Sequence, residues 1–295
     1  MYSEIDANKR KTVLLILGFV VFIGFLSYFG GLYYGDFTIT IGALIGSIVY
    51  ALFSYFGASK VALAFNGAVE IQKKDNPRLW RIVENIAITD GLPMPKVHII
   101  EDSGLNAFAT GRDPNHASVA ITTGLLEILD DSELEGVMAH ELGHVKNYDI
   151  RVSMIVFGLV MIVSMLSDIF LRVSWYGGRR SNDDNDNASN ILMVFGIVAM
   201  ILAPIIAVLI QSAISRKREY LADATGAMTT RYPEGLASAL EKLRDNSTVL
   251  RRQNTSTAHL FFANPLKGKG ITSMFSTHPP IEDRIAKLRS MGSKL

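Results

Sequence analysis

Two histidines, His140 and His144, lie four residues apart in the segment HELGH, and Glu141 directly follows the first. Residues four apart share one face of an α-helix, so both imidazoles can reach one metal ion while the glutamate reaches a water molecule beside it. This spacing predicts a zinc site that activates water for hydrolysis. The alternative is a surface helix that carries the two histidines by coincidence, which is rare for a five-residue pattern of this composition.

The segment around the motif has the pattern of a helix packed against a core. Ser132, with Glu135 three residues later, predicts a capping box at its N-terminus. Apolar residues recur at helical spacing behind the histidines, which predicts a buried stripe. They are Leu134, Val137, Met138, Leu142 and Val145.

A catalytic zinc site needs a third protein ligand, and the chain has no cysteine to supply one or to form disulfides. In the segment REYLADA, Glu219 and Asp223 are four residues apart on a predicted helix. Glu219 could bind the metal while Asp223 accepts a hydrogen bond from the outer N–H of a ligand histidine. Alternatively, the two carboxylates form an exposed pair that offsets Arg216 and Arg218. The residues alone leave both interpretations open.

Apolar stretches long enough to cross a bilayer flank these motifs. The chain of 295 residues is 49% hydrophobic with a mean hydropathy of +0.25, which is high for a soluble protein. Its net charge of +1 gives no reason to expect a nucleic-acid partner. Asp168 and Pro204 interrupt the last two stretches, so a non-spanning hairpin is the alternative there. Four segments reach the required length of about 18 residues: 12–33, 39–57, 154–171 and 191–214.

The distribution of lysine and arginine predicts the orientation of these segments. Basic residues cluster at 9–11, at 60–74 and at 216–218, whereas Asp36 is the charged residue of the turn between the first two segments. The positive-inside rule therefore places both termini and the metal site in the cytoplasm. Residues 177–190, GGRRSNDDNDNASN, are polar and without periodicity, which is typical of a flexible connector.

Between the two apolar pairs lies a segment with mixed helix and strand patterns. Residues 77–90 predict a helix, whereas 96–100, 106–110 and 117–122 predict strands of a small sheet beside the metal helix. The strand at 106–110 is either an ordinary strand or an edge that binds substrate by backbone pairing. The predicted fold is an α-helical membrane protein with about four transmembrane helices and a mostly α, α+β zincin-like catalytic domain.

The predicted organisation alternates membrane and catalytic parts. Residues 1–66 form a transmembrane hairpin, and 67–150 carry the sheet and the HELGH helix. Residues 151–214 form a second transmembrane pair, and 215–295 carry the third ligand and the C-terminal segment STHPPIEDRI.

The motifs NAFATG, HELGHVKNYD, REYLADA and STHPPIEDRI, with two apolar pairs between them, resemble the HtpX-type membrane zinc metalloproteases. These are gluzincins related to the prenyl-protein protease family, and the resemblance covers essentially the whole chain. It implies one Zn²⁺ per chain, held by His140, His144 and Glu219, with Glu141 as the general base. It also implies a substrate-side strand with Asn106, Ala107, Phe108 and Ala109.

The resemblance also gives expectations for the surroundings of the metal. Asp223 would orient a ligand histidine, and Asp149 would either lie behind the metal ligands or make a local structural contact. His278 would donate to the transition-state oxyanion, and Arg284 would lie on the substrate side.

The activity that the resemblance implies is an endopeptidase in the plasma (cell inner) membrane that removes misfolded or damaged membrane proteins under stress. Its expected partners are protein substrates, the lipid bilayer and other quality-control proteases. A protease that processes one membrane-anchored or lipidated protein is the alternative, and a non-catalytic membrane adaptor is a third reading.

Overall fold

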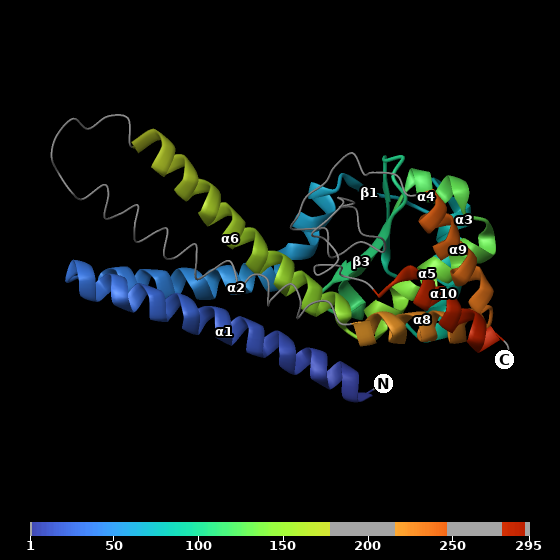
Figure 1. Ribbon diagram of the computed structural model, residues 1–295, viewed down its shortest axis with the longest axis horizontal. Helices are drawn as coiled ribbons and strands as arrows, with labels where there is room; N and C mark the ends of the chain where they lie inside the picture. The colour runs from blue at the N-terminus through green and yellow to red at the C-terminus, as the bar shows by residue number, and fades with distance from the viewer. Residues whose placement is uncertain (1, 178–215, 247–278, 293–295) are drawn as a thin grey trace.

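Two long helices, α1 (Tyr2–Tyr34) and α2 (Thr38–Phe65), form an antiparallel hairpin that extends away from the rest of the molecule (Figure 1). The computed structural model describes residues 2–177, 216–246 and 279–292. Both helices are long and apolar enough to cross a membrane, over Glu4–Phe29 and Thr40–Phe65. The predicted segments 12–33 and 39–57 lie within α1 and α2, respectively. Large apolar side chains along the hairpin are exposed, as expected for a surface that lipid covers.

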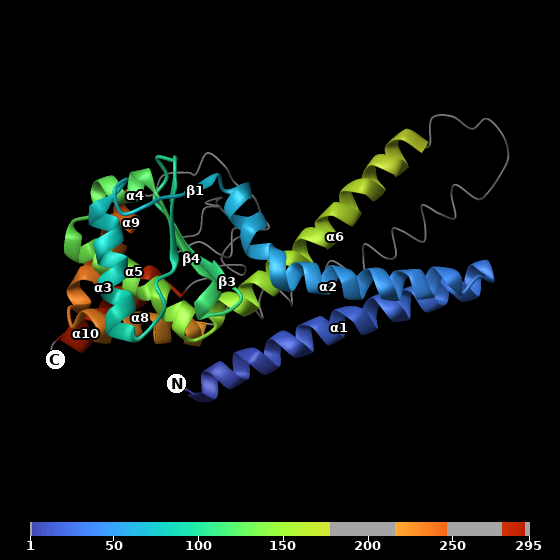
Figure 2. The same ribbon diagram turned by 180° about the vertical axis from the view of Figure 1, so that it is seen from behind.

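The third predicted membrane segment lies in α6 (Asp149–Gly177), which leaves the body at an angle to the hairpin (Figure 2). The first part of α6 packs against α1, α2 and the sheet, and its side chains from Ile150 to Val160 are mostly buried. Among the described residues, the hairpin helices alone meet the criteria for a membrane span. The fourth segment, 191–214, and the connector from residue 178 lie outside the described residues. The count of four spans therefore stays a prediction.

The sheet has four strands in the order β1-β2-β4-β3, where β2 and β4 are parallel and the other neighbours are antiparallel. The strands predicted at 96–100 and 117–122 are β2 (Lys96–Ile100) and β4 (Ala117–Thr122), and the NAFAT strand is β3 (Ala107–Gly111), one residue later than expected. Strand β3 is the outermost strand beside β4, and all its residues are buried. The three-residue β1 (Ala68–Glu70) was not predicted, because so short a strand has no periodicity to read.

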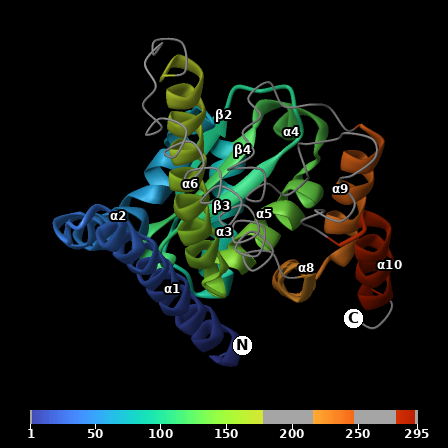
Figure 3. The ribbon, with the colours of Figure 1, turned by 60° about the vertical axis from the view of Figure 1, so that its left-hand side comes forward.

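Helix α5 (Asp131–Lys146), which carries the HELGH motif, lies between the sheet and the C-terminal helices (Figure 3). The predicted helix at 77–90 is α3 (Pro77–Asp90), which packs against α5. At Gly136 an added Cβ would lie 2.6 Å from the backbone nitrogen of Leu236, so only glycine allows this approach of α9 to α5. The remaining elements are a 3-10 turn (Pro114–His116), α4 (Thr123–Ile128), α8 (Arg216–Thr230), α9 (Pro233–Asp245) and α10 (Ile281–Gly292).

The predicted capping box of α5 was wrong by two residues. Asp130 is the N-cap: its carboxylate accepts from Glu133 N at 2.9 Å, and the Glu133 side chain accepts from Asp130 N at 2.8 Å. Ser132 instead donates its hydroxyl to Asp130. The sequence contains two overlapping boxes of the same spacing. Tertiary structure selects the earlier one, because Lys242 of α9 donates to Glu133 at 2.6 Å.

Candidate metal centre

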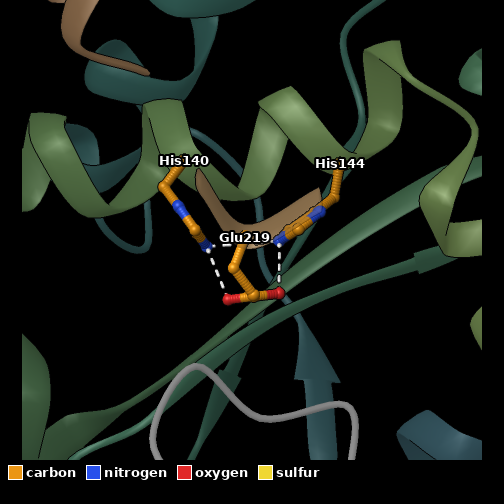
Figure 4. Close-up of side chains that lie close together, drawn as sticks. All are labelled: His140, His144 and Glu219. Carbon is orange, nitrogen blue, oxygen red and sulfur yellow. Dashed lines mark hydrogen bonds and ion pairs between the residues drawn. The ribbon is translucent and has the colours of Figure 1, made fainter. Parts of the chain in front are cut away.

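Three potential ligands converge from two helices. His140 and His144 project from α5, and Glu219 projects from the first turn of α8, so that their donor atoms all lie within 4.8 Å of one another (Figure 4). The two Nε2 atoms are 3.2 Å apart. The Glu219 carboxylate lies below both imidazoles, with Oε2 3.9 Å from Nε2 of His140 and Oε1 3.6 Å from Nε2 of His144.

These separations suit a zinc ion. Around a tetrahedral Zn²⁺ with bonds of about 2.0–2.1 Å, neighbouring ligand atoms are about 3.3 Å apart. The Nε2–Nε2 distance of 3.2 Å matches that value. One oxygen of Glu219 lies 3.6 Å from Nε2 of His144 and the other lies 3.9 Å from Nε2 of His140, so a shift of the carboxylate would bring one oxygen to ligand distance from both nitrogens. Two imidazoles and one carboxylate are also a ligand set that leaves the fourth position to a water molecule or a substrate.

Close packing of α8 on α5 brings Glu219 into reach of the histidines. A Cβ added at Gly226 would lie 3.0 Å from the backbone nitrogen of His140, so a larger residue there would push the two helices apart. Glu219 and Asp223 are 7% and 2% exposed. The alternative of an exposed carboxylate pair was therefore wrong.

Each histidine has a carboxylate at its outer nitrogen. Nδ1 of His140 lies 2.9 Å from Oδ1 of Asp223, and Nδ1 of His144 lies 2.9 Å from Oδ2 of Asp149. A carboxylate at Nδ1 keeps the proton on that nitrogen and leaves the lone pair of Nε2 free to bind a metal. Both carboxylates thus lie where a partner that orients a ligand histidine must lie.

Arg284 of α10 contacts both carboxylates of α8, Asp223 and Glu219. Its guanidinium donates two hydrogen bonds to Asp223, at 2.9 and 2.6 Å, and lies 3.9 Å from Oε2 of Glu219. The side chain is buried. The sequence grouped Arg284 with the substrate-binding residues, but these contacts make it a partner of the carboxylates at the metal centre. A substrate contact by Arg284 stays a prediction.

The sequence model of peptidase family M48 matches residues 73–292, which include the three potential ligands, Asp149, Asp223 and Arg284. The chain belongs to this family. It is 52% identical over 294 residues to the protease HtpX homolog of Tropheryma whipplei (strain TW08/27), with 100% of this chain and 99% of that protein covered. The protease HtpX homolog of Dictyoglomus thermophilum is 45% identical, with 99% and 95% covered. The HtpX-type resemblance is therefore confirmed, and the chain is a metalloendopeptidase.

The crystal structure of Ste24p from S. mikatae has the same fold. It aligns with a TM-score of 0.51 at 20% identity, over 98% of this chain and 67% of that one. The fold prediction is thus confirmed for the mostly helical body with its small mixed sheet.

The other residues predicted for the site are placed as follows. Glu141 is buried on α5 beside His140. Strand β3, with Ala107, Phe108 and Ala109, packs against α5, and Asn106 directly precedes it. His278 lies outside the described residues, so its role stays a prediction.

Two residues that the sequence did not assign to this M48 site contact Asp149. Arg218 Nη1 lies 3.6 Å from its Oδ1, and Asn8 Nδ2 lies 2.8 Å from the same oxygen. Asn8 is about 140 residues away in the sequence, and no motif links it to the metal ligands.

Burial and the surrounding carboxylates give the two histidines of this peptidase different proton affinities. Burial lowers the pKa of His140 to about 4, against the opposing effect of Asp223. Burial acts in the same sense on His144, but the hydrogen bond to Asp149 and the charges of Glu219 and Asp149 outweigh it and raise the pKa to about 9. Burial of Asp223 is likewise outweighed by Arg284 and His140, which lower its pKa to about 2. At neutral pH His140 is therefore neutral, whereas His144 of the apo site carries one additional proton and a positive charge.

We expect the affinity for zinc to fall as the pH falls below the pKa of His144, which is about 9. The metal needs the neutral imidazole, so it must displace one proton, and each unit of pH then weakens binding about tenfold. His140 stays neutral down to its pKa of about 4 and adds no second proton in this range. Competition with a chromophoric chelator between pH 6 and about 9 measures the slope. An affinity independent of pH would show that the apo site carries no proton to displace.

Arg284→Leu is expected to destabilise the apo protein by roughly 3–5 kcal/mol, because it leaves the buried Asp223 carboxylate without its charge partner. Thermal unfolding of the full chain in detergent measures the effect. Arg289→Leu is the matched control on the same helix: Arg289 pairs with Glu234 and Glu241 at the surface, and we expect little change there. Equal shifts for both variants would contradict the expectation.

Proposed function

We propose that the chain is a zinc-dependent endopeptidase, embedded in the plasma membrane with its active site facing the cytoplasm, that cleaves misfolded or damaged membrane proteins. The observation that carries the catalytic part is the cluster of His140, His144 and Glu219, whose donor atoms lie within 4.8 Å. The same ligands accept cobalt or manganese, so zinc is proposed on the fit of the distances and the ligand set.

A bound zinc ion supplies a Lewis acid that polarises the scissile carbonyl and acidifies a water molecule. We assign the proton transfers to Glu141: its carboxylate takes a proton from the attacking water and delivers it to the leaving amine. Asp223 and Asp149 hold the outer N–H groups of the two histidines, so that each Nε2 keeps its lone pair for the metal. His278 is proposed as a donor to the oxyanion.

The substrate is proposed to bind as an extended peptide along β3. This strand is the last in the sheet order and packs against the helix of the histidines. Pairing through backbone hydrogen bonds gives affinity with little dependence on side chains. Such binding suits an enzyme whose substrates share an unfolded state rather than a sequence.

The membrane arrangement rests on how the apolar helices join the catalytic body. Residues 1–66 are proposed as the first membrane hairpin and 151–214 as the second, with 67–150 and 215–295 as the two catalytic parts. Only Asn147 and Tyr148 separate α5 from α6. Such a short connection would keep the metal centre close to the bilayer, where membrane-anchored substrates reach high effective concentrations.

Substrate trapping tests the quality-control role. Membranes that contain the active protein are compared by proteomics with membranes that contain the Glu141→Gln variant, under normal growth and under heat stress. Many unrelated membrane proteins that accumulate only with the variant support quality control. Accumulation of one membrane-anchored or lipidated protein, cut at one position by the active enzyme, supports the processing alternative instead.

Reporter fusions test the topology. We expect fusions after Lys60 and at the C-terminus to report the cytoplasm, and a fusion after Asn185 to report the opposite side, because basic residues cluster at 9–11, 60–74 and 216–218. A cytoplasmic signal after Asn185 would make 151–214 a hairpin that does not cross the bilayer.

A further inference from the structure

The side chain of Asn8 connects the first long helix, α1, to the metal centre. Asn8 of α1 donates from Nδ2 to Oδ1 of Asp149 at 2.8 Å and to the backbone oxygen of Asn147 at 2.9 Å. It is only 5% exposed, although it lies in the polar first part of α1, next to the basic residues 9–11. A buried amide is costly unless its hydrogen bonds are satisfied, and Asn147 and Asp149 satisfy them here.

The Asp149 carboxylate divides its two oxygens between the histidine and the membrane helix. Oδ2 lies 2.9 Å from Nδ1 of His144, whereas Oδ1 receives the amide of Asn8 and lies 3.6 Å from the guanidinium of Arg218. Donors on both sides fix the rotation of the carboxylate, and with it the direction in which Nε2 of His144 points. Asn8 contributes a donor without adding a charge.

The chain between the metal helix and α6 has an unusual conformation at this point. Tyr148 has a φ of 61°, in the left-handed region that residues with a side chain seldom adopt. This turn starts α6 at Asp149, whose carboxylate then meets His144. Two side chains of α1 hold the turn: Asn8 binds the carbonyl of Asn147, and the Lys9 ammonium lies 4.9 Å from the centre of the Tyr148 ring.

From these contacts we infer that Asn8 is a positioning residue of the metal centre: the N-terminal membrane helix sets the orientation of His144 through the chain Asn8–Asp149–His144. The inference rests on the proposed zinc site, and it gives the first apolar helix a role beyond anchoring. Replacing a residue that hydrogen-bonds a metal ligand typically lowers metal affinity ten- to a hundredfold. Asn8 contacts the ligand His144 only through Asp149, so its effect should be at the lower end of that range. We therefore expect Asn8→Leu to weaken zinc binding roughly tenfold.

The experiment uses the full chain in detergent micelles, first stripped of metal and then titrated with zinc against a chromophoric chelator. Asn8→Leu keeps the size of the side chain and removes the amide. Asn8→Asp keeps the size and places a carboxylate against Asp149, so the loss of affinity should be at least as large. Thr12→Val is the matched control: Thr12 is buried one turn further along α1 and donates to the backbone oxygen of Asn8.

Two further readouts separate positioning from a general loss of structure. Visible absorption of the Co²⁺-loaded protein reports the geometry around the ion and should change in both Asn8 variants but not in Thr12→Val. Thermal unfolding of the apo proteins shows whether the Asn8 variants fold. The inference is supported if both Asn8 variants fold, bind zinc more weakly and show altered Co²⁺ bands, whereas Thr12→Val shows neither change.

Each other outcome is equally decisive. Wild-type affinity in Asn8→Leu, or an equal loss in Thr12→Val, overturns the positioning role. If neither Asn8 variant folds, Asn8 acts through stability and the inference also fails. Absence of zinc binding by the wild-type protein would instead contradict the proposed function itself.

Discussion

Glu141→Gln is expected to lower kcat/KM for an unfolded protein substrate by at least about a hundredfold while the bound zinc stays at one ion per chain. Glutamine keeps the shape of the side chain but cannot take a proton from water. The metal should stay bound, because the described ligand cluster consists of His140, His144 and Glu219 and does not include Glu141. Cleavage of casein and metal analysis of the same purified sample measure the two quantities.

Glu135→Gln is the control for this result, since Glu135 lies earlier on the same helix and outside the metal cluster. We expect it to leave both quantities unchanged. Near-normal cleavage by Glu141→Gln would assign the proton transfer to another group. Loss of zinc together with activity would mean that Glu141 contributes to holding the metal.

Glu219→Ala is expected to lose both metal and activity. It leaves two histidines as ligands, which should not retain zinc during dialysis against a mild chelator. Metal content after dialysis, measured beside wild type, gives the result directly. Retention of tightly bound zinc with normal cleavage would place the third ligand elsewhere and refute the assignment of Glu219.

Asp223→Asn provides an intermediate case on the same helix. It keeps the size of the side chain but weakens the partner of His140 Nδ1, which is 2.9 Å away in the wild type. We expect zinc affinity to fall about ten- to a hundredfold, since partners behind metal ligands have effects of that size. Metal retention should therefore decrease from wild type to Asp223→Asn and further to Glu219→Ala. A larger loss of zinc in Asp223→Asn than in Glu219→Ala would mean that Asp223 binds the metal and that Glu219 orients a histidine.

Local patterns in the sequence were enough to predict the helices that carry the candidate ligands, three strands of the sheet and the apolar hairpin. The spacing of His140 and His144 follows from helical geometry, and so does the pairing of Glu219 with Asp223, since each pair lies on one turn of a single helix. Long apolar runs likewise predicted α1 and α2, because burial in lipid depends on composition and length. The role of Glu219 as a ligand, however, came from the resemblance to a family and not from the residues alone.

Contacts between distant segments were decided only by tertiary structure. The sequence could not tell which carboxylate meets which histidine, nor that Arg284 pairs with Asp223. It also favoured the wrong one of two overlapping capping boxes at α5, because Lys242 of a later helix stabilises the other. Asn8 is the clearest case: a polar residue near the chain start looks like a solvated flank until α1 packs beside α6. Periodicity determines which residues share a face of a helix, whereas the partner of that face depends on how the helices pack.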